Sequence, residues 1–240
     1  MLEILLVVIV VLLFLYYGVP LLYMSGLRVR LTRRGRRRRQ LVLTFDDGPG
    51  NHLTARVLDL LRKNNGKATF FLLGRNIAGR EDLVRRIAAE GHEIGAHGFD
   101  HLHYWKVGPL RSIADIRRGW SAVDQALGRQ GGAYPFRPPY GKVNLACLIY
   151  LWMRHVPIVY WTYDSGDTWP PDRREAQWAR LPGDVPDGAV VLMHDFDRTG
   201  THVDGMVIDV VQRFLDRTAE KGIGLSTISD FLRDCRAQLD

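Results

Sequence analysis

Two adjacent carboxylates, Asp46 and Asp47, end an apolar run over residues 41–43, and a Gly-Pro pair follows them. The run predicts a buried strand, and in α/β folds the ligand crevice lies at the carboxyl ends of the strands. Two acids side by side are unfavourable there unless something neutralises one of them. We therefore expect chemistry at this point. The alternative is an Asx-rich turn that caps a helix near Thr54.

A second polar cluster follows another short strand and contains His97 and His101. Residues four apart lie on the same face of a helical turn, so both imidazoles can reach one ion. With a carboxylate they form a divalent-metal site with open positions, and the Asp46-Asp47 pair would supply one ligand and one unbound carboxylate. The alternative is a pair of surface or capping histidines. His103 is a further candidate, but so close to His101 it should point elsewhere.

Arg137 begins a third cluster, Arg-Pro-Pro-Tyr-Gly, which covers residues 137–141. The two prolines stiffen an extended chain and hold the arginine beside a turn. A guanidinium fixed in this way can clamp a carboxylate in a bidentate pair, although the same sequence also suits a simple polyproline turn.

Two more clusters carry acids and a histidine. Residues 161–169 close another apolar run and contain Asp164 and Asp167 between aromatic flanks, and His194 ends the run that begins at Val190. Each of these side chains alone could be a satisfied core or edge residue. Five polar clusters at the ends of successive strands are hard to ascribe to chance, and we expect them to meet in one site.

Short apolar strands and amphipathic helices alternate from residue 40 onward. This alternation predicts a mainly parallel sheet, and six or seven such units favour a closed or nearly closed barrel over an open sheet. Cys147 and Cys235 are too few and too far apart to indicate a disulfide framework or a cysteine metal site. The predicted strands cover residues 41–45, 68–73, 93–96, 157–163 and 190–193, and the predicted helices cover 54–63, 81–90, 109–127, 143–154, 203–221 and a segment from 228.

The N-terminal segment contains an uncharged apolar stretch, residues 4–24. A helix of about 20 residues spans a hydrocarbon core of about 30 Å, and tyrosines near the end of the stretch suit the membrane interface. A secretory signal would carry its positive charge before the apolar run, so we expect an uncleaved anchor. The alternative is a buried helix of the globular domain. We expect an anchor over residues 1–27, an arginine-rich juxtamembrane linker over 28–39 and one globular domain over 40–240.

The positive charge is concentrated in the linker. Eight of the 33 Lys and Arg residues lie at positions 28–39, which leaves 25 against the 25 acids that follow, since Glu3 is the only other acid. The domain is therefore formally neutral, and the net charge of +7 does not indicate a nucleic-acid partner. Positive flanks stay on the cytoplasmic side, so we expect the domain to face the cytoplasm, with the arginines near anionic headgroups. A solvated linker or a nucleic-acid patch is the alternative.

Four motifs together resemble a known family, the polysaccharide deacetylases of the NodB-homology, carbohydrate esterase family 4 type. They are Thr-Phe-Asp-Asp-Gly-Pro at 44–49, the His-x-x-x-His pair, Arg-Pro-Pro-Tyr-Gly and Leu-x-His at 192–194, in this order. The resemblance covers residues 40–232. It implies a deformed (β/α)7-type barrel and metal-dependent removal of N- or O-acyl groups from sugars, so that the domain over 40–240 would be catalytic.

The resemblance also implies roles for individual residues. Asp46 resembles the general base, and Asp47, His97 and His101 resemble the metal ligands. The remaining expected roles are a residue that orients the base (Arg137), a backbone N–H in the oxyanion hole (Tyr140), an acid that tunes the catalytic histidine (Asp164 or Asp167), a groove wall (Trp169), a floor for the acyl methyl (Leu192) and the general acid (His194).

Two positions depart from the family pattern. Gly98 stands where the family has Ser or Thr after the first histidine, which removes a potential hydrogen bond behind the metal ligands or to the substrate. Thr168 separates Asp167 from Trp169, which the family has adjacent. Neither departure removes an expected ligand.

The expected cofactor is one divalent ion, Zn²⁺, for which Co²⁺, Ni²⁺ or Fe²⁺ are alternatives. Two histidines and a carboxylate also hold iron in oxygenases, but an oxygenase has no role for Asp46, Arg137 and His194. A non-catalytic, membrane-tethered sugar-binding module is a third hypothesis, and an intact base and acid argue against it.

The expected substrate depends on the side of the membrane. A cytoplasmic domain beside the bilayer would meet a lipid-linked amino sugar, such as an N-acylated sugar on a polyprenyl phosphate carrier. A domain that faces outward would meet peptidoglycan or an exported poly-N-acetylhexosamine.

Overall fold

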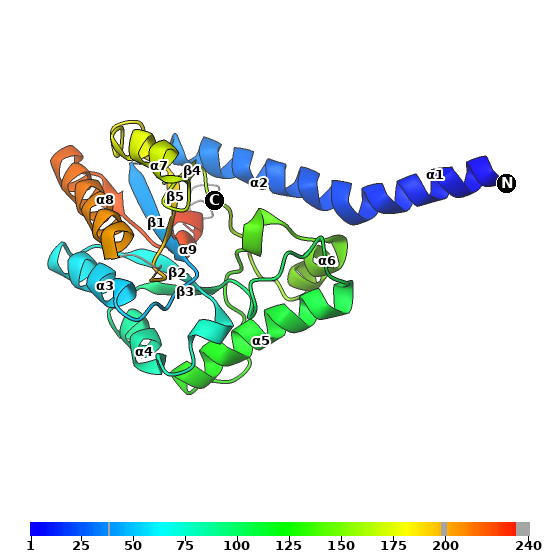
Figure 1. The fold of residues 1–240 in the computed structure, drawn as a ribbon, viewed down its shortest axis with the longest axis horizontal. Coiled ribbons are helices and arrows are strands. Elements are labelled where there is room, and N and C mark those ends of the chain that lie inside the picture. The colour runs from blue at the N-terminus through cyan, green and yellow to red at the C-terminus, as the bar shows by residue number, and fades with distance from the viewer. Residues whose placement is uncertain (38, 198–200, 234–240) are drawn as a thin grey trace.

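The computed structural model describes residues 1–37, 39–197 and 201–233. Its centre is a parallel sheet in the order β3-β2-β1-β5-β4 (Figure 1). A short strand, β6, pairs with the start of β1. The strands are β1 (Gln40–Asp46), β2 (Ala68–Leu72), β3 (Glu93–Ala96), β4 (Tyr163–Asp164), β5 (Val190–His194) and β6 (Gly224–Leu225).

Two isolated bridges continue this sheet toward a closed barrel. Phe136 pairs with Ala96 at the end of β3 and, on its other side, with Ile158. The chain then runs from Ile158 to β4, which pairs with β5. The predicted deformed α/β barrel is therefore confirmed. The strand predicted over residues 157–163 is wrong in its extent, because this segment changes partner from Phe136 to β5 and forms no continuous ladder.

Helices surround the sheet and their ends follow local sequence signals. Proline begins α5, Asn144 caps α6 by accepting a hydrogen bond from Cys147 N at 3.0 Å, and Gly128 ends α5 in the left-handed conformation. One helix, α7, was not predicted. The helices of the domain are α3 (Leu53–Lys63), α4 (Glu81–Ala89), α5 (Pro109–Leu127), α6 (Leu145–Met153), α7 (Pro171–Trp178), α8 (Thr201–Lys221) and α9 (Ile228–Arg233), with short 3-10 turns η2 (Gly74–Asn76) and η3 (Pro139–Gly141).

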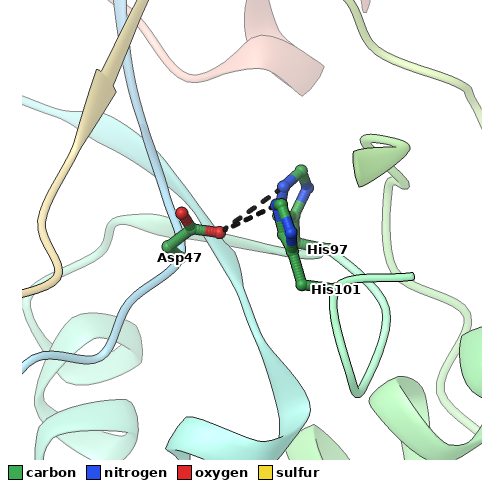
Figure 2. Close-up of side chains that lie close together, drawn as sticks. All are labelled: Asp47, His97 and His101. Carbon is green, nitrogen blue, oxygen red and sulfur yellow. Dashed lines mark ion pairs between the residues drawn. The ribbon is translucent and has the colours of Figure 1, made fainter. Parts of the chain in front are cut away.

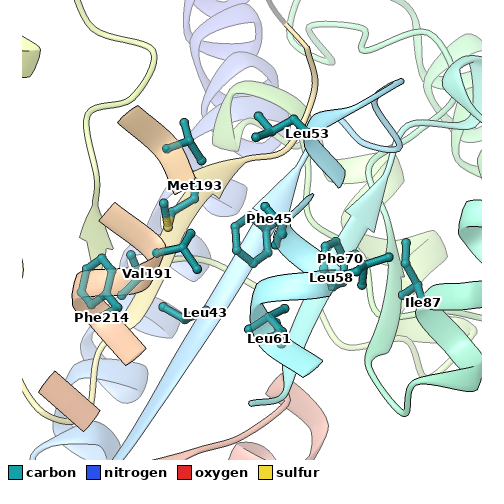
Figure 3. Close-up of a cluster of buried hydrophobic side chains, with 14 of the residues drawn as sticks. Leu43, Phe45, Leu53, Leu58, Leu61, Phe70, Ile87, Val191, Met193 and Phe214 are labelled. Carbon is teal, nitrogen blue, oxygen red and sulfur yellow. The ribbon is translucent and has the colours of Figure 1, made fainter. Parts of the chain in front are cut away.

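The side chains of β1 point alternately to its two faces, and this decides which of them reach the barrel interior. Leu43 and Phe45 pack in the core under the outer helices with Phe70, Val191 and Phe214 (Figure 3). Val42 belongs instead to the second core cluster, with residues such as Phe136 and Tyr160. Successive strand residues point to opposite faces, so Thr44 and Asp46 follow Val42 inward.

The N-terminal segment is one helix over Leu2–Gly35, made of α1 (Leu2–Leu13), a π-helical turn η1 (Phe14–Gly18) and α2 (Val19–Gly35). It bends where α1 meets α2 (Figure 1). Pro20 explains the bend, because it lacks the N–H for the bond to Tyr16 and crowds that carbonyl. By length and composition the helix could cross a membrane, and a signal sequence passes the same test.

The helix continues through most of the predicted linker and docks on the domain. Residues 1–15 are exposed, whereas Pro20, Met24, Leu31 and Gly35 are buried. At the end of α2 the backbones touch, since a Cβ on Gly35 would lie 1.9 Å from the carbonyl oxygen of Gly188. The division into residues 1–27, 28–39 and 40–240 stays a prediction.

Candidate active site

Asp46 lies inside the barrel at the end of β1 and is 2% exposed. Its Oδ1 accepts a hydrogen bond from Arg137 Nη1 at 2.7 Å, and the same nitrogen donates to Thr44 Oγ1 at 2.7 Å. The pair is not bidentate as expected, because Arg137 Nη2 and Nε have no hydrogen-bond partner among the described residues. The guanidinium lies over the Phe71 ring at 4.1 Å instead, and the other carboxylate oxygen, Asp46 Oδ2, lies 3.9 Å from His97 Nε2.

Asp47, His97 and His101 converge on one point (Figure 2). Asp47 Oδ1 lies 3.6 Å from His97 Nε2 and 3.4 Å from His101 Nε2. Two atoms bound tetrahedrally to one Zn²⁺ at about 2.1 Å would lie about 3.4 Å apart. The spacing of these atoms therefore fits one shared ion of this size.

The tautomer of His97 also suits a metal ligand. Its Nδ1 lies 2.7 Å from the carbonyl oxygen of Arg137. A carbonyl can only accept, so Nδ1 carries the proton and Nε2 presents a lone pair toward Asp47. Burial, followed by the neighbouring His97, lowers the pKa of His101, which keeps this imidazole neutral as ligation requires.

Three site residues adopt the left-handed backbone conformation: Asp47 (φ 68°), His101 (φ 57°) and Tyr140 (φ 56°). Such a conformation costs about 1–3 kcal/mol per non-glycine residue, and the surroundings must hold it. Asn76 Nδ2 donates to the carbonyl of Asp47 at 2.8 Å, which is one of these supports. The site therefore depends on the loops as well as on the strand ends.

Asp115 of α5 holds the loop between the two histidines. Its carboxylate accepts hydrogen bonds from the backbone N–H groups of Phe99 (3.1 Å) and Asp100 (2.8 Å) and from the Tyr104 hydroxyl (2.7 Å). Gly98 lies against this carboxylate with φ +79°, and a Cβ there would lie 2.4 Å from Asp115 Oδ2. Glycine at position 98 therefore leaves space for the Asp115 carboxylate, which holds the loop between the two histidines.

His194 ends β5 directly beside Asp46 in the β1–β5 register. Asp167 accepts twice from this residue, from Nδ1 at 2.9 Å and from the backbone N–H at 2.7 Å. Burial opposes the charge on His194, but Asp167, with Asp46 and Asp47, raises its pKa to about 9. Asp164 instead accepts from Gly166 N at 2.9 Å, so Asp167 is the acid that contacts the histidine.

One cavity of about 310 Å³ is lined by Asp46, by the cluster of Asp47, His97 and His101, and by His194, together with Tyr140 and Leu192. Trp169, expected as a wall, is not among the lining residues: its ring lies against Gly166 and beneath the Arg173 guanidinium. The extra residue, Thr168, lines the cavity in its place. The complete lining is Asp46, Asp47, His97, His101, Pro138, Tyr140, Gly141, Trp161, Thr168, Leu192 and His194.

Sequence reasoning missed three supporting groups. One is Asp115, which has no local signal, and another is Trp161, which was noted only as an aromatic flank of the cluster over residues 161–169. The third is Asp195, whose Oδ2 accepts from Thr54 Oγ1 at 2.6 Å beneath the loop at Gly48, and whose pKa burial raises to about 7. Asp195 directly follows His194 at the end of the apolar run from Val190, and this position was its only sequence signal.

Similarity to known proteins agrees with this geometry. A family model for polysaccharide deacetylase matches residues 33–150. The chain is 30% identical over 195 residues to a peptidoglycan-N-acetylglucosamine deacetylase of Bacillus cereus, an alignment that covers 80% of this chain and 88% of that protein. The chain belongs to the polysaccharide deacetylase family.

Two further members show the extent of the likeness. The chain is 34% identical over 177 residues to the peptidoglycan-N-acetylglucosamine deacetylase PgdA of Listeria monocytogenes, which covers 73% of this chain and 36% of PgdA. It thus spans about a third of that relative. The crystal structure of the Bc1960 peptidoglycan N-acetylglucosamine deacetylase superposes with a TM-score of 0.70 at 30% identity, over 81% of this chain and 88% of that one.

Proposed function

We propose that the protein is a metal-dependent hydrolase that removes an N-acyl group, in the first place N-acetyl, from an amino sugar. The observation that carries the proposal is that the cluster of Asp47, His97 and His101 shares one cavity with a separate acid, Asp46, and a separate histidine, His194. Family membership supports the same reaction, since the named relatives are deacetylases of N-acetylated glycans.

The cluster of Asp47, His97 and His101 is the proposed metal site. A divalent ion held there would polarise the acyl carbonyl and lower the pKa of a bound water. Nitrogen and oxygen donors with open positions suit Zn²⁺, and Co²⁺, Ni²⁺ or Fe²⁺ would fit the same donors.

The protein's own groups then move the protons. Asp46 accepts a proton from the attacking water, and the Arg137 ion pair holds its carboxylate in orientation. The Tyr140 backbone N–H donates to the carbonyl oxygen as negative charge develops there. His194 is protonated at neutral pH because of Asp167, and it transfers its proton to the nitrogen as the C–N bond breaks. The products are a carboxylic acid and the free amine.

This arrangement favours a hydrolase over the two rival hypotheses. An iron oxygenase would use the same three ligands but has no role for a fixed Asp46–Arg137 pair or for the Asp167–His194 pair. A sugar-binding module would need neither an ionised base nor a protonated acid beside the metal site. Both pairs have the contacts that acid–base catalysis requires.

We propose that the N-terminal helix anchors the enzyme in the membrane as a single span and that the domain faces the cytoplasm. The arginines at residues 28–39 support this side by the positive-inside rule. The substrate would then be a lipid-linked amino sugar at the inner leaflet. The second candidate is an extracytoplasmic peptidoglycan or poly-N-acetylhexosamine, which the names of the relatives favour.

Amine release tests the reaction. Metal-loaded protein is expected to release free amine and acetate from an N-acetylglucosamine oligomer, and Asp46→Asn is expected to lose at least about a hundredfold in kcat, since general-base catalysis contributes that much. Asp164→Asn is the matched control, because this acid does not contact His194 and its hydrogen bond from Gly166 survives in the amide. Oxygen-dependent turnover would indicate the oxygenase, and no turnover on any acylated sugar would indicate the binding module.

A further inference from the structure

The exposed part of the N-terminal helix is too short to span a bilayer by itself. Residues 2–15 are exposed, and 14 helical residues rise about 21 Å, whereas a hydrocarbon core is about 30 Å thick. Roughly six more residues must therefore lie in the hydrocarbon layer. These residues already touch the domain: Tyr17 donates to the carbonyl of Trp105, and Pro20 is buried.

The domain presents an apolar surface beside the helix residues that must lie in the hydrocarbon layer. α6 packs beside η1 and α2, and Figure 1 shows it on the side of the domain from which α1 projects. Ile149 (47% exposed), Trp152 (74%) and Met153 (66%) form one outer stripe of α6. We call these three side chains the α6 face.

On both α6 and the N-terminal helix, apolar residues are followed by an aromatic ring and then by a cation. Tyr23 and Trp152 line the same cavity between α2 and α6. Beyond them the next charged residues are Arg28 on the anchor and Arg154 after α6. Aromatic rings followed by cations are the pattern of a membrane–water boundary.

The surrounding charge suits anionic headgroups. Residues 101–114 and 141–157, which form the loops and helices around the α6 face, contain four Lys or Arg residues and no Asp or Glu. Each such cation near an anionic leaflet contributes about 1 kcal/mol to binding.

We infer that the α6 face is a second membrane contact, which sinks into one leaflet of an anionic bilayer beside the N-terminal span. Surface-bound helices bury their apolar side about 5–10 Å into the headgroup and acyl boundary, and this depth matches the missing length of the span. The catalytic domain is then partly embedded in the leaflet and not tethered at a distance from it.

The cavity mouth is connected to this contact by aromatic side chains. The Tyr17 and Trp105 rings lie 5.6 Å apart, Trp105 and His103 6.4 Å, and His103 and Tyr140 5.1 Å. Tyr140 lines the cavity and touches His101 at 4.6 Å between ring centroids. The cavity therefore lies a few side chains from the span.

A cation of the N-terminal helix, Arg28, lies beside Trp161 of the cavity lining. Arg28 donates to the carbonyl of Trp161 at 3.3 Å, and its guanidinium lies 5.1 Å from the Trp161 ring, which lines the cavity. If the proposed function holds, an acylated sugar carried on a lipid phosphate in the same leaflet would place its phosphate level with Arg28. This extension rests on the proposed reaction, whereas the membrane contact rests only on the proposed N-terminal span.

Depth measurement on the full chain tests the contact. Spin labels at Ile149→Cys and Met153→Cys, in a background without Cys147 and Cys235, are placed in nanodiscs of phosphatidylcholine and phosphatidylglycerol. Oxygen is expected to collide with both labels more often than a water-soluble nickel chelate does. A label at Asp216→Cys, exposed on α8, is the control and should report water. More frequent collisions with the nickel chelate at both α6-face labels would overturn the inference. Spin–spin broadening that disappears on dilution with unlabelled protein would also overturn it, because a second copy of the chain would then cover the face.

The extension to substrate has its own readout. The Ile149→Ser, Trp152→Ser double variant is expected to lose at least about tenfold in kcat/KM on an N-acetylated amino sugar anchored in vesicles of the same lipids, with unchanged turnover of a soluble oligomer. An equal loss on both substrates would refute the link between the membrane contact and the substrate. Inactivity of the unmodified protein on both would refute the proposed function and leave the depth measurement valid.

Discussion

At the scale of single residues, Gly98 is the most constrained position beside the metal ligands. A side chain there would meet Asp115 Oδ2 at 2.4 Å and the Tyr104 hydroxyl at 2.8 Å, and φ is +79°. Ser, the residue type of the family pattern, would therefore have to displace the carboxylate that holds the histidine loop. The position of the Asp115 carboxylate and its hydrogen bond from Tyr104 therefore depends on glycine at position 98.

We predict that Gly98→Ser lowers the free energy of unfolding by about 1–3 kcal/mol and weakens zinc binding by about tenfold or more. Thermal unfolding and competition with a zinc-binding dye measure the two effects. Gly79→Ser is the matched control, because Gly79 has φ +77° but no atom within 4 Å of its Cβ position. Equal losses in both variants would show that backbone strain alone is responsible.

The Asp167–His194 pair predicts a pH dependence. His194 acts in its protonated form, so activity should fall as the pH rises through its pKa, which Asp167 and the nearby acids raise to about 9 against the effect of burial. Asp167→Asn removes the main favourable charge, so the alkaline limb of the kcat profile should move to lower pH by about one unit or more. An alkaline limb that stays in place would contradict the assignment of His194 as the acid.

Most residues of the candidate site could be singled out from the sequence because they follow apolar runs, and their roles stay predictions. It did not distinguish Asp164 from Asp167, since both follow the same run and the choice depends on the turn at Gly166, which has φ +74°. Asp115 was missed, and Trp161 was noted only as an aromatic flank, for a related reason: their positions depend on contacts with distant segments, which no local pattern reports.

At the scale of elements, the junction between α2 and the start of β5 positions the anchor on the barrel. Gly35 and Gly188 meet backbone to backbone, where a Cβ on either glycine would lie less than 2 Å from the other's carbonyl oxygen. A larger residue at either position must separate the two segments.

We predict that Gly35→Ala destabilises the protein by about 1–3 kcal/mol and raises hydrogen exchange in residues 28–39. Gly26→Ala, in the same helix with no atom within 4 Å of its Cβ position, should instead be neutral or stabilising by up to about 1 kcal/mol. Unchanged exchange in Gly35→Ala would mean that the end of α2 is not held by this contact.

Most elements were predictable from periodicity, because β1, β2, β5 and the long helices α5 and α8 carry strong apolar patterns. The segment over 157–163 was misjudged, because an apolar run also suits a chain that crosses from one bridge to another strand. α7 is short and polar, so it has little apolar periodicity to detect.

At the scale of the whole molecule, the N-terminal helix is partly free of the domain and partly packed on it. Its first half is exposed and apolar, and its second half packs on the barrel close to the cavity. The sequence predicted the apolar span and the arginine cluster. The docking was missed because residues 28–39 were interpreted as a linker, although the buried residues of α2, which are Pro20, Met24, Leu31 and Gly35, recur at helical spacing.

The arginine cluster predicts the orientation of the molecule. A cysteine introduced at exposed Asp216 is expected to resist a membrane-impermeant maleimide in intact cells and to react after lysis. The same reagent should label a known extracytoplasmic cysteine in parallel. Labelling of position 216 in intact cells would refute the cytoplasmic side and favour the extracytoplasmic substrate.

Anomalous diffraction from zinc-loaded crystals tests the central claim most directly. We predict one ion, about 2.0–2.2 Å from an Asp47 oxygen and from Nε2 of His97 and His101, with Asp46 beside it, still paired with Arg137 and not coordinated. An ion bound elsewhere, or one that takes Asp46 as a ligand in place of either histidine, would contradict the account.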